Sequence, residues 1–281
     1  MTGARPPGQP GSRDVGPGSG VLAQPADHLP WCMRASELLG RALVRCSTRV
    51  TIEGLENVPR AGGALIIAGN HVSHADPACV AVFITPALGR PVHFMTKAEA
   101  LGWPIAGRFM KANGAFAVRR GAADAEAFRL ARRILDEGRV LGVFPEGTRS
   151  PTGGLQVARD GVALLALRTG APILPVGLAD TDRFWPRGRL LWRLGGRISL
   201  RIGEPFTVER GLGPDGRRES LEAVTTRLMV RIAALLPERQ RGVYGPVLAG
   251  EVALPAASGP PPRVRASAGG PASAKTSRPN S

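Results

Sequence analysis

The chain has 281 residues, of which 43% are hydrophobic and 21% charged, and it carries a formal net charge of +15. This length has room for one large α/β domain, and the charge indicates an anionic partner such as nucleic acid, a phosphorylated metabolite or an acidic membrane surface. Nucleic acid is disfavoured because aromatic residues make up only 5% of the chain, with one tyrosine, and no zinc-finger, RNP or basic-helix pattern occurs.

The three cysteines show no metal-binding pattern. Cys32, Cys46 and Cys79 lack Cys-x-x-Cys spacing and a histidine that would complete a zinc site. They fit a reduced, cytoplasmic compartment best. No P-loop or Gly-x-Gly-x-x-Gly motif occurs either, so we expect neither a metal nor a nucleotide or redox cofactor.

Both ends of the chain differ in composition from the middle. Residues 1–26 are crowded with Gly, Pro and Ser, and residues 255–281 have almost no apolar side chains. Such segments bury too little surface to offset their ordering entropy. We therefore expect disordered tails at 1–29 and 251–281 around a single folded domain at 30–250. The segment 255–281 holds four basic residues and no acid, so a net charge of about +11 lies in the rest of the chain.

The first predicted element is an amphipathic helix at 31–46. Its apolar residues recur at helical spacing, Arg34, Arg41 and Arg45 fall together on the other side, and Trp31 stands at its start. This composition is typical of a helix that lies in a membrane interface, but a helix packed on the domain shows the same pattern. No stretch reaches the ~20 apolar residues that a spanning helix needs, and no signal peptide is visible. We expect a peripheral protein on the cytoplasmic face of a membrane.

Beyond this helix, strand-like and helix-like runs alternate. The strand-like runs are 48–53, 64–68, 91–95, 115–118, 140–144 and 172–177. The helix-like runs are 77–84, 100–112, 122–137 and 159–169, and a last amphipathic helix at about 217–236 ends before Pro237. Two late apolar runs, 189–194 and 197–202, flank Gly195-Gly196 and predict a hairpin. The alternation predicts an α/β fold with a mixed, largely parallel sheet flanked by helices.

A polar cluster follows the strand-like run 64–68 and reads Asn70-His71-Val72-Ser73-His74-Ala75-Asp76. Loops at strand ends present chemistry from a rigid scaffold in α/β folds. A carboxylate that holds one ring nitrogen of a histidine leaves the other as a general base. Asp76 could orient His71 in this way, although the spacing also permits His74. A structural interpretation is that Asp76 caps a helix beginning near Pro77, and both interpretations can hold together.

A second polar cluster, Phe144-Pro145-Glu146-Gly147-Thr148-Arg149-Ser150, follows the run 140–144. Gly147 lets the backbone approach a ligand closely, Thr148 can donate a hydroxyl hydrogen bond, and Arg149 offers a planar fork suited to phosphate. Glu146 repels phosphate and would instead fix the arginine or a glycerol hydroxyl. The alternative is an ordinary turn with an exposed salt bridge, which contributes little to stability.

Three further cations follow other predicted strands, and they would enlarge one cationic pocket if these strand ends face the same side. They are Lys97, Arg119 and Arg120. For Lys97 and Arg120 a solvated charge is the alternative. Covalent catalysis fits poorly, because no Gly-x-Ser-x-Gly elbow occurs and Cys79 lies in the apolar stretch 78–84. These residues indicate direct transfer between two bound substrates.

Four sequence blocks occur in order along the chain. They are Asn-His-x-Ser-x-x-Asp from Asn70, Gly-Ala-Phe-Ala-Val-Arg-Arg from Gly114, Phe-Pro-Glu-Gly-Thr-Arg-Ser from Phe144, and Ile-Leu-Pro-Val-Gly from Ile173. In these blocks, over roughly residues 45–210, the chain resembles the glycerolipid acyltransferase family, whose best-known members are the 1-acylglycerol-3-phosphate acyltransferases. The second block departs from the family pattern, which usually has an acidic residue before its arginine. This departure concerns the acyl acceptor and not the reaction type.

The resemblance implies an O-acyltransferase that moves a fatty acyl group from an acyl thioester, acyl-CoA or acyl carrier protein, to the hydroxyl of a lysophospholipid. With 1-acylglycerol-3-phosphate as acceptor the product would be phosphatidate. In the family the base is the histidine directly after the asparagine, which is His71 here, whereas His74 occupies a variable position. The expected partners are the lipid acceptor, the acyl donor and an anionic membrane surface. The alternatives are a different lipid acceptor, or a non-enzymatic basic protein that binds membrane surfaces or nucleic acid.

Overall fold

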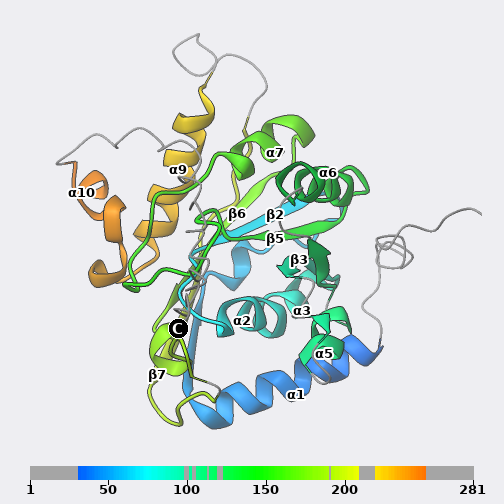
Figure 1. Cartoon of the computed structure of the whole chain (residues 1–281), viewed down its shortest axis with the longest axis vertical. Coiled ribbons are helices and arrows are strands. Elements are labelled where there is room, and N and C mark those ends of the chain that lie inside the picture. Colours follow the sequence, from blue (N-terminus) through cyan, green and yellow to red (C-terminus); the bar gives the residue numbers. More distant parts are fainter. Residues whose placement is uncertain are drawn as a thin grey trace, which may run out of the picture.

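A computed structural model describes residues 31–97, 101–102, 106–112, 114–118, 123–189, 191–208 and 219–250. These residues form a seven-stranded sheet in the order β1-β7-β6-β2-β5-β3-β4, with helices on both of its faces (Figure 1). The α/β fold with a mixed, largely parallel sheet is confirmed. The tails predicted at 1–29 and 251–281 lie outside the described residues.

The predicted elements of the sheet agree with the structure to within two residues at each end. The strands are β1 (Arg49–Glu53), β2 (Leu65–Gly69), β3 (Val92–Lys97), β4 (Phe116–Val118), β5 (Val140–Val143), β6 (Ile173–Ala179) and β7 (Arg197–Ile202). The helices are α1 (Trp31–Ser47), α2 (Ala75–Phe83), α3 (Thr85–Leu88), α5 (Ala106–Ala112), α6 (Ala123–Asp136), α7 (Gly161–Thr169), α8 (Thr181–Phe184), α9 (Leu221–Ala234) and α10 (Gly245–Leu248). Short 3-10 turns are η1 (Leu55–Asn57), η2 (Glu238–Gln240) and η3 (Gly242–Tyr244).

Strand β2 is the centre of the hydrophobic core. It pairs in parallel with β5 on one side and with β6 on the other, and all five of its residues are buried. Ile66 and Ala68 belong to the cluster under α6, α7 and α9, while Leu65 and Ile67 belong to the cluster under α2. A parallel strand covered on both faces reads as a continuous apolar run, which explains why this strand was easy to predict.

The predicted hairpin of 189–194 with 197–202 is wrong. Residues 191–194 form no strand, and β7 pairs instead in parallel with β1 and antiparallel with β6. The preceding segment folds back on α8, because the backbone N–H of Arg193 donates to the Phe184 carbonyl at 2.8 Å and the Trp192 ring packs against Phe184 and Trp185. Tertiary contacts of an aromatic side chain thus override the local hairpin signal.

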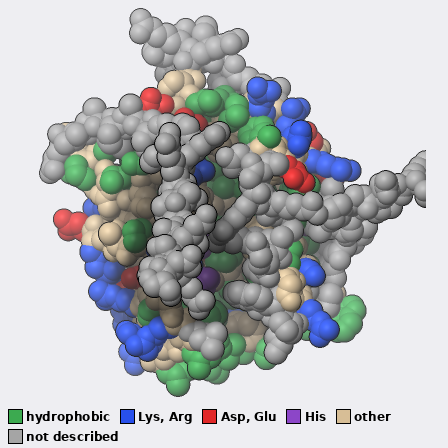
Figure 2. Space-filling model, viewed as in Figure 1, with side chains coloured by type: hydrophobic (Ala, Val, Ile, Leu, Met, Phe, Trp, Pro, Cys, Tyr) green, Lys and Arg blue, Asp and Glu red, His purple; other side chains and the backbone are tan. Residues whose placement is uncertain are grey.

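Helix α1 packs on α2 with its polar side. Glu37 is buried in this contact, Arg41 donates through Nε and Nη2 to the Val82 carbonyl at 3.2 and 3.1 Å, and a Cβ at Gly40 would lie 2.8 Å from Val82 Cγ1. Met33 is buried as well (2% exposed), whereas four other large apolar side chains of the helix point to solvent: Trp31 (82% exposed), Leu38 (66%), Leu39 (71%) and Leu43 (47%). We call these four residues the apolar face of α1, and Figure 2 shows hydrophobic side chains along the lower edge of the molecule, where α1 lies in Figure 1.

Candidate active site

The two polar clusters lie together at the carboxyl ends of two neighbouring strands of the sheet. Strands β2 and β5 are parallel neighbours, with Ala68 opposite Val143, so the residues that follow them emerge side by side. A hydrogen bond from the backbone N–H of Ser150 to the His71 carbonyl, 2.7 Å long, joins the two loops directly. The structure therefore brings together the residues that the sequence analysis assigned to one shared site.

Asp76 organises the first loop. The residue is fully buried, and its Oδ2 accepts hydrogen bonds from His71 Nδ1 at 2.8 Å and from the backbone N–H groups of Val72 and Ser73, each at 2.7 Å. Its Oδ1 accepts from the Thr181 hydroxyl at 2.5 Å. A carboxylate cannot donate, so Nδ1 of His71 carries the proton in this pair and the lone pair of the neutral ring is at Nε2.

The helix-cap interpretation of Asp76 is wrong. Helix α2 begins at Ala75, and Asp76 therefore lies in its first turn. The backbone groups that Asp76 binds precede the helix, so its carboxylate shapes the loop and the histidine ring at once. His74 is the residue before the helix; it is exposed, and its ring lies 5.9 Å from the Trp185 ring.

Two polar residues that the sequence analysis did not assign fix the loop to β6. Asn70 Nδ2 donates to the Leu178 carbonyl at 2.9 Å, and the Leu178 N–H donates to Asn70 Oδ1 at 2.7 Å. The amide thus continues the pairing of β2 with β6 beyond the end of β2. Thr181, at the start of α8 just after β6, supplies the hydroxyl that Asp76 accepts. Its position directly after a buried strand is the signal that could have revealed it.

The His71 ring lies flat against an aromatic wall. Its centroid is 4.2 Å from that of Phe144, with an angle of 15° between the planes, and Phe144 in turn stacks on Phe94 at 5.9 Å. The His71 side chain is 19% exposed. A ring held by Asp76 at Nδ1 and by Phe144 on one face has little freedom to rotate, which suits a base that must meet a substrate proton in a fixed position.

Glu146 fixes the backbone of the site. Its Oε1 accepts from the His71 N–H at 2.7 Å, and its Oε2 accepts from the Gln156 N–H at 2.9 Å. Burial raises the pKa of this carboxyl, and the hydrogen bonds from the two N–H groups oppose that shift. Both oxygens bind main-chain groups, so no arginine contact of Glu146 is present among the described residues, and its contact with a glycerol hydroxyl stays a prediction.

The next three residues of the second cluster face outward, whereas Ser150 is buried. Gly147 and Thr148 are exposed and Arg149 is half-buried. Gly147 has a φ of 70°, in the left-handed region that favours glycine, and its N–H donates to the Phe144 carbonyl at 3.0 Å, so it forms the turn that presents Arg149. Burial and the nearby Arg187 lower the pKa of Arg149, whereas Asp76 raises it. Arg149 directly precedes Ser150, whose N–H is bonded to the His71 carbonyl, so its backbone lies beside the loop of the histidine–aspartate pair.

The other predicted cations are not placed by the structure. Lys97 is the last residue of β3, next to β5 in the sheet, but only its backbone is described. Arg119 and Arg120 lie outside the described residues. Their contribution to a cationic pocket stays a prediction.

The other titratable groups near the core have structural surroundings. His93 is buried and its Nδ1 lies 3.1 Å from the Gly114 carbonyl; burial lowers its pKa. Cys79 is a buried free thiol whose pKa is raised by burial. Within the described ranges, no group of three or more His, Cys, Asp or Glu side chains is placed to hold a metal ion. These residues therefore add no second reactive centre to the described part of the chain.

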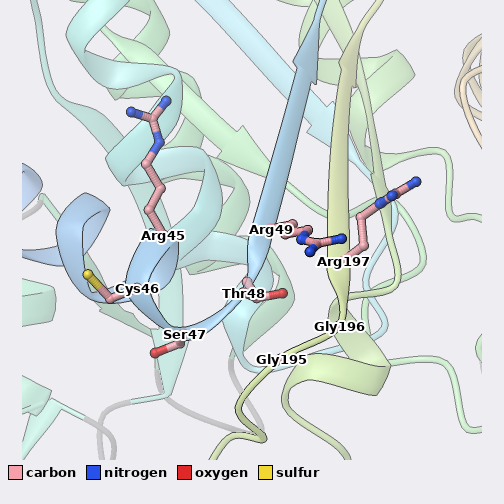
Figure 3. A pocket seen from close by; sticks show the side chains of 8 residues that line it. All are labelled: Arg45, Cys46, Ser47, Thr48, Arg49, Gly195, Gly196 and Arg197. Carbon is pink, nitrogen blue, oxygen red and sulfur yellow. The ribbon is translucent and has the colours of Figure 1, made fainter.

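A separate cleft of about 510 Å³ lies between the end of α1, the start of β1 and the turn before β7 (Figure 3). Arg49 and Arg197 are paired in the β1–β7 register, and Figure 3 shows Arg45 pointing away from them, with its guanidinium 5.9 Å from the centroid of the Phe83 ring of α2. None of the residues of the histidine–aspartate site lines this cleft. Its three arginines place positive charge at the end of α1.

Together the fold and the site define an α/β protein with an oriented histidine–aspartate pair and a neighbouring arginine loop at one edge of its sheet. The family model Acyltransferase matches residues 49–179. A 1-acyl-sn-glycerol-3-phosphate acyltransferase of Borreliella burgdorferi is 33% identical over 159 residues, 54% of this chain and 62% of the relative. A lyso-ornithine lipid O-acyltransferase of Pseudomonas aeruginosa is 31% identical over 183 residues, 58% of this chain and 67% of the relative. The chain belongs to the glycerolipid acyltransferase family.

A solved structure supports the same assignment. The crystal structure of the 1-acyl-sn-glycerophosphate (LPA) acyltransferase PlsC from Thermotoga maritima matches with a TM-score of 0.55 and 28% sequence identity, over 70% of this chain and 78% of that chain. The match with the Borreliella relative spans less than two thirds of that protein's length. The residues that the family model matches, 49–179, include both polar clusters.

Proposed function

We propose that this protein is an O-acyltransferase that moves a fatty acyl group from acyl-CoA or acyl carrier protein to the hydroxyl of a lysophospholipid, with 1-acylglycerol-3-phosphate as the favoured acceptor and phosphatidate as the product. The observation that carries the proposal is the 2.8 Å contact between His71 Nδ1 and the buried Asp76, in a loop bonded to the one that holds Arg149. The names of the Borreliella and Thermotoga relatives support it.

In this mechanism His71 acts as the general base. Its Nε2 takes the proton of the acceptor hydroxyl while that oxygen attacks the thioester carbonyl carbon. The C–S bond then breaks, and the proton held on His71 passes to the departing sulfur, which leaves as a free thiol. Asp76 keeps the ring in the required tautomer and stabilises the imidazolium that forms. Proton transfer by such a placed base contributes about 10²–10⁴-fold to the rate, and holding both substrates in register contributes more.

Arg149 is the proposed ligand of the acceptor phosphate. Its planar guanidinium can bind two phosphate oxygens, and its place next to Ser150, which is bonded to the His71 carbonyl, would hold a glycerol hydroxyl within reach of His71. The Pseudomonas relative is named for a lyso-ornithine lipid, so a different lipid acceptor is the second candidate. Arg149 favours the phosphate-bearing one.

Membrane attachment in this proposal is peripheral and on the cytoplasmic face. No helix among the described residues is long and apolar enough to cross a membrane. The apolar face of α1 is exposed, and Arg45, Arg49 and Arg197 lie at the end of that helix. Apolar contact with acyl chains and attraction to anionic headgroups would together hold the site at the lipid surface from which the acceptor comes.

An acceptor panel tests the proposal. The purified protein is incubated with an acyl-CoA or an acyl carrier protein thioester and with one lysolipid at a time, and the products are identified by mass spectrometry. We expect phosphatidate from 1-acylglycerol-3-phosphate. Absence of any acylated product with both donors and every acceptor would contradict the proposal and favour a binding protein instead.

A further inference from the structure

The guanidinium group of Arg149 has a buried nitrogen, Nη1, that donates no hydrogen bond to the described part of the protein. Arg187 lies near enough to lower its pKa, so a second positive charge adds to the unfavourable burial of the first. Burying charge without a partner is costly. An anion that bound both guanidinium groups would remove this cost.

Arg187 stands at the corner of a turn that is bonded to the catalytic loop. The Arg189 N–H donates to the Pro186 carbonyl at 3.2 Å, and Gly188 has a φ of 81°, as the third position of a type II turn requires. Trp185 anchors this turn, since its Nε1 donates to the Arg189 carbonyl at 3.0 Å and its own carbonyl accepts from the Ser73 hydroxyl at 2.9 Å.

The Arg187 side chain is free to meet a ligand. It is exposed and makes no ion pair with the described part of the chain. By contrast Arg183, four residues earlier, pairs with Asp180 at 3.4 Å. The turn with Arg187 is bonded to the histidine loop through Trp185 and Ser73, and the loop with Arg149 is bonded to it through Ser150 and His71. The two arginines are therefore carried by segments that both contact the loop of the base.

We propose that Arg187 is a second phosphate-binding residue and that, with Arg149, it selects an acceptor carrying a phosphate monoester over one carrying a phosphodiester. The inference rests on the proposed function and names its acceptor class. A monoester with a second pKa near 6 carries about −1.5 to −2 charges at pH 7, whereas a diester carries one. Two guanidinium groups match the monoester, and its three terminal oxygens suffice for two arginine forks.

The test compares Arg187→Ala with Arg189→Ala, which removes the same charge from the same turn. The kcat and KM of both variants and of the wild type are measured with 1-acylglycerol-3-phosphate and with lysophosphatidylglycerol, one acyl donor being used throughout. For Arg187→Ala we expect the KM for the monoester to rise about tenfold, the size of one lost hydrogen bond between charged groups. Its kcat and donor KM should stay within about twofold of wild type, and its preference for the monoester should fall by about the same tenfold.

Arg189→Ala should keep the wild-type preference, and Arg187→Lys should give an intermediate KM because it restores the charge without the fork. If Arg187→Ala and Arg189→Ala shift KM equally, or if the preference for the monoester is unchanged in Arg187→Ala, the inference is wrong while the proposed function stands. A wild-type protein that acylates neither acceptor would overturn the proposed function and this inference with it.

Discussion

At the scale of single residues, Asp76 connects more of the site than any other described side chain. Its two oxygens serve the His71 ring, two loop N–H groups and the Thr181 hydroxyl. The loop geometry and the tautomer of the base therefore depend on one buried carboxylate. This explains why the aspartate must lie a fixed number of residues after the histidine.

Asp76→Asn tests this coupling. The amide cannot accept at both ends as the carboxylate does, and it does not stabilise an imidazolium, so we expect kcat to fall about 10²–10⁴-fold. The free energy of unfolding should also fall, by about 1–3 kcal/mol, because buried donors lose their acceptor. Steady-state kinetics and urea denaturation measure the two effects. The double variant with His71→Ala should be no slower than His71→Ala alone; a further large loss would show that the two residues act independently.

Arg149→Lys tests the phosphate role. A point charge cannot reproduce a bidentate fork, so the KM for the phosphate-bearing acceptor should rise about tenfold while the KM for the acyl donor changes little. Titrating each substrate at saturating levels of the other gives both values. Equal effects on the two substrates would indicate that the loop is structural.

At this scale the sequence predicted the members of the site better than their contacts. The His71–Asp76 pair is local, five residues apart, and could be predicted from spacing and family resemblance. The partners of Glu146 could not, because they are backbone N–H groups that only the packed loops bring together. Thr181 and Arg187 were missed for the same reason, since each reaches the site from a segment more than a hundred residues after Asp76.

At the scale of elements, α1 buries polar as well as apolar residues and leaves most of its large apolar side chains exposed. Its polar residues Glu37 and Arg41 face the domain beside the buried Met33, whereas the four residues of its apolar face point outward. The structure shows that the helix packs on α2, and its role in a membrane interface stays a prediction that the exposed apolar face supports. The periodicity of apolar residues predicts that a helix has a polar and an apolar face, but it does not predict which face packs against the domain.

The apolar face of α1 gives a membrane prediction. Leu38→Glu combined with Leu39→Glu should weaken binding to anionic vesicles at least about tenfold, since burial of each leucine stabilises the bound state by about 1.5–3 kcal/mol. Acyl transfer to a soluble short-chain acceptor should be unaffected. The matched control is Leu55→Glu with Val243→Glu, which adds the same charge at exposed apolar positions on other elements.

Vesicle co-sedimentation measures this binding, and added salt should reduce it because the basic residues contribute. Equal weakening by the two double variants would show that net charge and not the helix face decides the binding. Binding that only detergent reverses would contradict a peripheral attachment.

The buried Glu37 gives a pH prediction. Burial raises its pKa from 4.5 to about 7, and Arg41 and Arg34 oppose the shift. Because the folded-state pKa lies above the unfolded one, folding favours the protonated carboxyl. The contribution of this group to the free energy of unfolding is therefore present below pH 4.5 and is lost as the pH rises through 7. Relative to wild type, Glu37→Gln should therefore gain up to about 3 kcal/mol between pH 4.5 and pH 8. Urea denaturation at both pH values measures it; a difference between the two proteins that does not change with pH would contradict the assignment.

At the scale of the whole molecule, the topology decides where the chemistry lies. The parallel strands β2, β5 and β6 end at one edge of the sheet, and β7, which runs antiparallel to β6, begins there. The histidine loop, the Glu146–Arg149 loop and the turn with Arg187 all follow strands that end at this edge. An open parallel sheet collects functional loops at the carboxyl ends of its strands.

The alternation of strands and helices, and hence the fold class, could be predicted because each buried parallel strand leaves a continuous apolar run. The pairing of β7 could not be predicted, since its partner β1 lies about 150 residues earlier and nothing local identifies it. The domain bounds of 30–250 stay a prediction. They follow from composition alone.

The central claim is that His71 is the base of an acyl transfer, and thiol release from acyl-CoA in the presence of 1-acylglycerol-3-phosphate tests it most directly. Wild type, His71→Ala and the exposed neighbour His74→Ala are compared, with circular dichroism to verify that all three are folded. We predict that wild type and His74→Ala release thiol and form phosphatidate at comparable rates, while His71→Ala loses at least about 10²-fold. Full activity of His71→Ala, or loss in His74→Ala alone, would contradict the account.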